Sequence, residues 1–352
     1  MYTRRTLLAT AALTLALAAP VGARADAPIP VVATFSILGD MVARIGGEHI
    51  ALTTLVGPGG DAHVYQPTPA DARAVSEADV LFVNGLDFEG WLDRLVEASD
   101  FDGTRVVSTK GMAALPFEEG DDHDDDHAGE AHGGHDDHAG EAKGEHGHSE
   151  HGHDEQGHDD HSEHAEGDHH GHDHGAFDPH AWQSLEFAVT YIDNITAALA
   201  TADPANAATF YQNRAAYVAE IEALDAEIRA IVAALPEDRR TVVTSHDAFG
   251  YFEAEYGLAF EAPQGLSTES EPSAADVAAM IDQIREESIS AVFVESITDN
   301  RLLQQIASET GATIGGTLYS DALSEPDGPA GTYLDMMRHN ATTIAAALSS
   351  QG

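Results

Sequence analysis

One stretch of the 352-residue chain, residues 118–174, has a composition that excludes a packed core. It holds sixteen of the 21 histidines among Asp, Glu, Gly and Ala, and it contains no Val, Ile, Leu, Met or aromatic residue. A segment without apolar side chains cannot bury enough surface to offset the entropy of ordering itself. We therefore predict a disordered, solvated loop over residues 118–175, with folded sequence on either side.

The same stretch is rich in metal ligands. Imidazole and carboxylate groups at this density bind borderline divalent metals, zinc first. The formal net charge of the chain is −45, and 21 acidic residues against Lys143 give this stretch −20 of it. Such a chain attracts cations and repels nucleic acid, so we expect no nucleic-acid partner. A solvated charged linker would account for the acidity but not for sixteen imidazoles, so we interpret the stretch as a metal-gathering loop.

The first 25 residues have the three parts of a signal peptide. Arg4-Arg5 precede an apolar run from Leu7 to Ala19, and Ala23-Arg24-Ala25 is a small-x-small cleavage site. The apolar run is short for a membrane span. The chain has no cysteine, which leaves no thiolate zinc site, no disulfide and no lipid-modified cysteine. We therefore expect a soluble, monomeric protein of the periplasm.

The remaining sequence alternates between strand and helix patterns. Short apolar runs predict strands at residues 29–35, 50–56, 80–83, 104–107, 241–244, 291–294 and 313–318. Helical spacing is found at residues 37–45, 69–78, 89–97, 249–256, 273–287, 299–310 and 332–348. This alternation is typical of mostly parallel sheets flanked by helices.

Two helical segments separate the two series of strands. The first is residues 184–201, and the second starts at Asp203-Pro204 and extends to Leu235, about 45 Å at 1.5 Å per residue. We predict an α/β protein of two lobes joined by this long rigid helix. The N-terminal lobe would comprise residues 26–202, the connecting helix 203–235 and the C-terminal lobe 236–352.

Four side chains that can bind metal follow predicted strands or the loop. His63, His246 and Asp321 come after the strands at 50–56, 241–244 and 313–318, and His180 comes directly after the loop. Ligands of open α/β sheets bind beyond the carboxyl ends of the strands. Three imidazoles and one carboxylate would make a tetrahedral zinc site. Glu295, after the strand at 291–294, could be buried in a salt bridge or could orient a ligand, and we favour these roles over direct binding of the metal.

Other interpretations of these residues remain open. Each histidine alone could be an ordinary surface or core residue, and Asp321 could cap the following turn. A zinc hydrolase with three histidines is an alternative, but the sequence has no H-E-x-x-H motif and no evident general base. A metal buffer whose loop is its whole function is another.

Four motifs resemble the metal-binding signatures of one known family. They are GDAHVYQPTP at residues 60–69, DPHAW at 178–182, TSHDAFGYF at 244–252 and YSD at 319–321. They resemble those of the zinc and manganese substrate-binding proteins of bacterial ABC importers, in the family's order. The resemblance covers nearly the whole mature chain.

The resemblance implies two α/β lobes, one long helix and a metal held between the lobes. It implies ligand roles for His63, His180, His246 and Asp321, with Zn²⁺ as the transported ligand and an ABC permease in the inner membrane as the partner. Manganese members usually have Glu at the position of His246, so the histidine and the His-rich insertion resemble the zinc members of the ZnuA or AztC type. Manganese transport is the alternative, and a periplasmic zinc metallochaperone that loads the site stays open as a further partner. The chain departs from one zinc branch, which has a disulfide in its second lobe.

Overall fold

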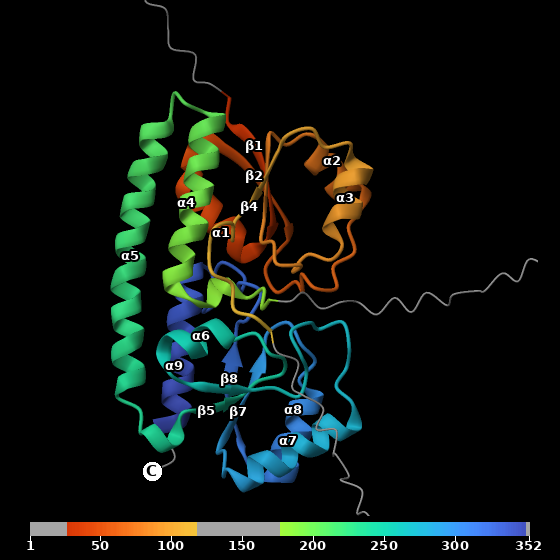
Figure 1. The fold of residues 1–352 in the computed structure, drawn as a ribbon, viewed down its shortest axis with the longest axis vertical. Coiled ribbons are helices and arrows are strands. Elements are labelled where there is room, and N and C mark those ends of the chain that lie inside the picture. The colour runs from red at the N-terminus through yellow and green to blue at the C-terminus, as the bar shows by residue number, and fades with distance from the viewer. Residues whose placement is uncertain (1–26, 118–176, 350–352) are drawn as a thin grey trace, which may run out of the picture.

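The computed structural model describes residues 27–117 and 177–349, which form two α/β lobes (Figure 1). The predicted signal peptide and the predicted His-rich loop lie outside these residues. Within the described part of the chain, no helix combines the length and apolar character that crossing a membrane would require.

The N-terminal lobe is a parallel four-stranded sheet in the order β2-β1-β3-β4. Its elements are β1 (Ile29–Phe35), α1 (Ser36–Gly46), β2 (Ile50–Val56), α2 (Pro69–Ser76), β3 (Val80–Val83), α3 (Leu92–Ser99) and β4 (Thr104–Val107). Helices α2 and α3 lie on one side of the sheet and α1 on the other (Figure 1). The apolar side chains of β1 and β3 are buried almost completely, as expected for strands covered on both faces.

The C-terminal lobe has the same topology, with a parallel sheet in the order β6-β5-β7-β8. Its elements are β5 (Thr241–Val243), α6 (Gly250–Tyr256), β6 (Ala259–Glu261), α7 (Ala274–Glu286), β7 (Ala291–Glu295), α8 (Arg301–Thr310), β8 (Thr313–Leu318) and α9 (Tyr333–Ser349). The sequence pattern does not predict β6. This edge strand has three half-buried residues, too few for a periodic signal.

Two long helices follow, the first beside the N-terminal lobe and the second beside both lobes (Figure 1). They are α4 (Leu185–Ala202) and α5 (Ala207–Ala233), and the 27 residues of α5 span about 40 Å. Helix α5 begins four residues later than predicted, because Asp203 starts a turn in which its carboxylate accepts the N–H groups of Ala205 and Asn206. It packs on α1, α4, α6 and α9, and one hydrophobic core extends from the first sheet along these helices into the second lobe. The expected fold class of two helix-flanked lobes with a long connecting helix is confirmed.

The start of α3 differs from the prediction for a physical reason. The pattern predicted a helix from Glu89, but α3 begins at Leu92. Residues 85–87 all have positive φ, at 90°, 56° and 60°. The buried carboxylate of Glu89 holds this turn by accepting the N–H groups of Asn84 and Gly85. Glu89 therefore stabilises a tight turn and does not begin the helix.

Candidate metal centre

The four side chains expected at the site meet between the lobes. His63, His180, His246 and Asp321 each offer one ligand atom, and these atoms lie within 4.8 Å of one another. Oδ2 of Asp321 is 3.2 Å from Nε2 of His63 and 3.1 Å from Nε2 of His246. The Nε2 atoms of His63 and His180 are 3.4 Å apart. Both lobes therefore contribute side chains to one cluster of three imidazoles and a carboxylate.

His63 and His180, the two histidines from the N-terminal lobe, are positioned by the same local hydrogen bond. In Asp61-Ala62-His63 and Asp178-Pro179-His180, the carboxylate accepts the backbone N–H of the histidine two residues later, at 2.9 and 2.8 Å. Asp178 also reaches the ring, with its Oδ1 2.7 Å from Nδ1 of His180. That contact favours the tautomer whose Nε2 is free to bind a metal. Asp61 instead accepts a hydrogen bond from Thr268 of the other lobe, at 2.6 Å.

His246 depends on Glu295 at the end of β7. Oε1 of Glu295 accepts the backbone N–H groups of Ser245 and His246, at 2.7 and 2.9 Å. Its Oε2 lies 2.7 Å from Nδ1 of His246. Glu295 is fully buried and its contact with the cluster passes through His246, which agrees with both roles expected for it, a buried ion pair and the orientation of a ligand.

The segment that carries Asp321 is fastened to the N-terminal lobe. The carbonyl of Ser320 accepts two hydrogen bonds, from Nε1 of Trp182 at 2.8 Å and from Nε2 of Gln183 at 2.7 Å. Asp321 is fully buried, and its Oδ1 has no hydrogen-bond donor among the described residues. A buried acceptor without a donor is uncommon unless a cation or water completes its surroundings.

The ionisable groups of the site influence one another strongly. Burial lowers the pKa of His63, so its imidazole is neutral and able to bind a metal at pH 7. Burial also acts to lower the pKa of His246, but the carboxylates of Glu295 and Asp321 raise it well above its ordinary value. Burial acts to raise the pKa of Asp321, but His246 and His180 hold it well below its ordinary value. The cluster thus places a buried carboxylate among imidazoles, and the carboxylates favour the protonated form of His246.

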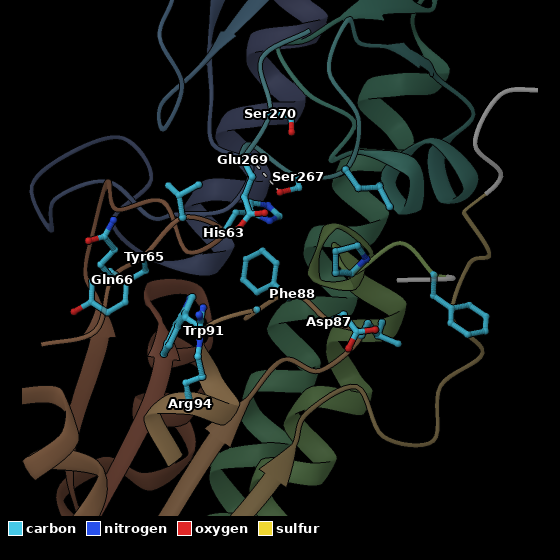
Figure 2. A pocket seen from close by; sticks show the side chains of 16 residues that line it. His63, Tyr65, Gln66, Asp87, Phe88, Trp91, Arg94, Ser267, Glu269 and Ser270 are labelled. Atoms are coloured by element: carbon cyan, nitrogen blue, oxygen red, sulfur yellow. Dashed lines mark hydrogen bonds between the residues drawn. The ribbon is translucent and has the colours of Figure 1, made fainter. Parts of the chain in front are cut away.

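Aromatic rings pack against His63 and His180. The ring of Phe88 makes an edge contact with His63, with centroids 4.7 Å apart, and packs on Trp182 at 4.8 Å. Trp182 in turn lies 5.3 Å from the ring of His180. Next to Phe88 and His63 is a cavity of about 700 Å³, which both lobes line (Figure 2). An apolar enclosure excludes water and strengthens electrostatic attraction inside the site.

Three supporting residues were not identified from the sequence. Asp178 and Asp61 stand two residues before a ligand-type histidine, so the repeated Asp-x-His spacing was the signal that could have identified them. Gln183 gave no such signal. Its partner Ser320 is 137 residues away, and only the folded chain brings the two together.

Comparison with known proteins places the whole chain in one group. It is 33% identical over 347 residues to the manganese-binding lipoprotein MntA of Bacillus subtilis, which covers 97% of each chain. It is 32% identical over 315 residues to the iron-binding protein YfeA of Yersinia pestis, covering 90% of this chain and 85% of YfeA. The structure of the periplasmic zinc binding protein TroA from Treponema pallidum matches with a TM-score of 0.73 and 27% identity, over 91% of this chain and 99% of that one.

A family model agrees with these relatives. The model for the zinc-uptake complex component A periplasmic family, ZnuA, matches residues 31–347. Proteins of this kind bind a divalent metal and work with a membrane permease, so the hydrolase alternative is wrong. The chain belongs to the ZnuA family, the metal-binding substrate-binding proteins of bacterial ABC importers.

Proposed function

We propose that this protein binds Zn²⁺ between its lobes and delivers it to an ABC permease for zinc uptake. The ligands would be Nε2 of His63, His180 and His246 and a carboxylate oxygen of Asp321. The observation that carries this proposal is the convergence of these four buried donors from both lobes on one point. Asp178 and Glu295, beside the Nδ1 atoms of two of the histidines, are the outer partners expected of metal-binding imidazoles.

The spacing of the donors supports tetrahedral coordination. A tetrahedral zinc site with bonds of about 2.0–2.1 Å separates its donors by about 3.3 Å. Three separations between donor atoms, 3.1, 3.2 and 3.4 Å, are near that edge length, and Nε2 of His180 lies 3.7 Å from Oδ1 of Asp321. The retained Asp321 occupies the fourth position, so the site would be closed rather than open to a water molecule.

The chemistry of the donors favours zinc over manganese. Imidazole suits zinc, whereas manganese prefers carboxylate, carbonyl and water oxygens. Relatives of this chain carry names that refer to manganese, iron and zinc, so likeness alone does not choose the metal. Manganese transport remains the second candidate, because MntA resembles this chain over nearly its full length.

We further propose that the His-rich residues 118–175 act as an accessory in a monomeric periplasmic protein made after cleavage of residues 1–25. The described residues that flank this segment lie near the site, since Phe177 lines the cavity beside His63 and Pro116 pairs with Phe177. Tethered ligands raise the local metal concentration without adding a contact to the site itself. Their imidazoles bind metal only when neutral, so this gathering weakens as pH falls below about 6.5.

The first test is a zinc titration of the mature protein lacking residues 120–174, with the bound metal counted by native mass spectrometry. One tightly bound zinc is expected. The same shortened protein with His63→Ala is the matched control and is expected to lose it. Tight binding that vanishes with the segment, or that survives His63→Ala, would show that the site between the lobes is not the functional one. Loss with the segment would favour the metal buffer.

The choice of metal needs a second measurement. Zinc and manganese are offered together to the shortened protein, first at equal concentration and then with manganese in large excess, and the retained metal is identified by mass spectrometry. Zinc is expected to be retained even when manganese is in large excess. Preferential retention of manganese would replace zinc as the transported metal.

A further inference from the structure

The four side chains of the metal centre differ in their access to solvent. His180, His246 and Asp321 are fully buried, whereas the side chain of His63 is 5% exposed. His63 is also the one of the four that lines the cavity of about 700 Å³ (Figure 2). A fully hydrated divalent ion occupies on the order of 200 Å³, at about 30 Å³ for each water, so this cavity has room for an ion with its hydration shell or with a chelating group.

The other sides of the centre are closed by packed or hydrogen-bonded groups. Trp182 covers His180 and holds the carbonyl of Ser320, next to Asp321. Glu295 covers the Nδ1 side of His246. A second cavity, of about 510 Å³, is lined by Ser245 and Asp61 but by none of the four ligand side chains.

Each lobe forms one half of the wall of the first cavity. The N-terminal half contains Asp87 and Phe88, which belong to the tight turn that the buried Glu89 holds. The C-terminal half is the segment from Leu266 to Ser270, which includes Glu269 and crosses the cavity from the other lobe (Figure 2). The two halves each contribute a carboxylate, Asp87 and Glu269, and the wall also contains the guanidinium of Arg94, so two acidic groups against one basic group leave the wall net acidic.

We infer that this cavity is the port through which metal enters and leaves the centre. His63 is then the first ligand to bind the incoming metal and the last to dissociate from the departing one. This inference rests on the proposed four-ligand site and adds its route of exchange. During release, an incoming imidazole, carboxylate or water donor forms a bond to the metal as the bond from Nε2 of His63 breaks. This is a ligand exchange without oxidation or reduction. The imidazole of His63 that leaves the metal rotates into the cavity that it already lines.

Two substitutions narrow the port from opposite lobes. Gly90 lines the cavity and has no atom within 4 Å of where its Cβ would stand, so Gly90→Phe adds a ring into open space. Ser270 is exposed and its bond to Gln264 uses its backbone carbonyl, so Ser270→Phe keeps that bond. Gln305→Phe is the matched control, because Gln305 is an exposed residue of the second cavity.

The measurement is the rate of metal exchange at constant affinity. Zn²⁺ is mixed with each full-length protein by stopped flow, and intrinsic fluorescence reports binding, since Trp182 and Trp91 both lie near the centre. Release is followed with excess EDTA. Both port variants should slow association and release together, on the order of tenfold, with the dissociation constant unchanged. Gln305→Phe should exchange at the rate of the unmodified protein.

Other outcomes overturn the inference. Unchanged rates in both port variants would mean that metal passes elsewhere. Weaker equilibrium binding with an unchanged association rate would mean that the added rings disturb the centre instead of obstructing a route. Absence of tight zinc in the unmodified protein would be a different failure, that of the proposed function.

Discussion

Nδ1 of His246 lies 2.7 Å from Oε2 of Glu295, and both side chains are fully buried. The other carboxylate oxygen of Glu295 accepts the backbone N–H groups of Ser245 and His246. One side chain therefore sets both the path of the chain into His246 and the orientation of its ring. An arrangement of this kind directs Nε2 toward the metal and makes it a better donor.

Removing the charge of Glu295 is expected to weaken zinc binding. Glu295→Gln keeps the size of the side chain but replaces one oxygen with an NH₂ group that cannot accept from the imidazole or from the backbone. The dissociation constant should rise about 10- to 100-fold, measured by competition with a zinc indicator. Glu261→Gln, at a half-buried edge-strand carboxylate outside the centre, is the control. An unchanged affinity in Glu295→Gln would show that the ring is oriented without this contact.

Zinc affinity is expected to fall as the pH is lowered. Because the pKa of His246 is raised, this fall should begin at a higher pH than it would for a free imidazole. Glu295 and Asp321 raise the pKa of His246 well above 6.5, so the metal-free protein carries a proton on this imidazole at pH 7. Zinc must displace that proton, and binding therefore strengthens as pH rises through the raised pKa. Calorimetry in buffers of different ionisation enthalpy should record proton release at pH 7. Absence of proton release would show that His246 is neutral before zinc binds.

Replacing His246 with a carboxylate is expected to shift the metal preference toward manganese. His246→Glu exchanges an imidazole for a harder oxygen donor and adds a negative charge beside Asp321 and Glu295. The ratio of zinc affinity to manganese affinity should fall, as measured by competition of the two metals in the protein lacking residues 120–174. His246→Ala removes a donor without adding an oxygen and serves as the control. An equal loss of preference in both variants would contradict the argument from donor type.

The segment before Asp321 offers a test of stability. Asn340 of α9 is fully buried, and it accepts the N–H of Tyr319 at 2.9 Å while it donates to the carbonyl of the same residue at 2.7 Å. Asn340→Leu leaves both backbone groups unsatisfied, at about 1–3 kcal/mol for each. The free energy of unfolding of the metal-free protein in urea should fall accordingly.

A surface variant makes that measurement interpretable. Thr342→Ala, at an exposed position of the same helix, should change the free energy of unfolding by no more than about 0.5 kcal/mol. If Asn340→Leu proved no less stable than Thr342→Ala, the hydrogen bonds to Tyr319 would not be what holds this segment.

The sequence by itself was enough to predict the two-lobed α/β fold and to identify the residues that meet at the centre. Buried parallel strands are continuous apolar runs, and their carboxyl ends share one edge of each sheet, so His63, His246 and Asp321 could be expected to converge. The sequence pattern predicted the wrong start for α3, because a tertiary contact outweighed the local preference for helix. The buried carboxylate of Glu89 holds the positive-φ turn at residues 85–87 and also accepts a hydrogen bond from the distant Thr34 of β1, and α3 starts later as a result.

Tertiary structure alone decided how the centre is supported and from which side it is reached. The contacts from Trp182 and Gln183 to Ser320 join residues 138 and 137 positions apart. No local pattern encodes such pairs, because they arise from the way the two lobes and α9 pack around one core. The same packing buries three of the four donors completely and leaves His63 beside a cavity. Residue types thus determined which atoms can bind a metal, whereas packing determined their orientation and their access to solvent.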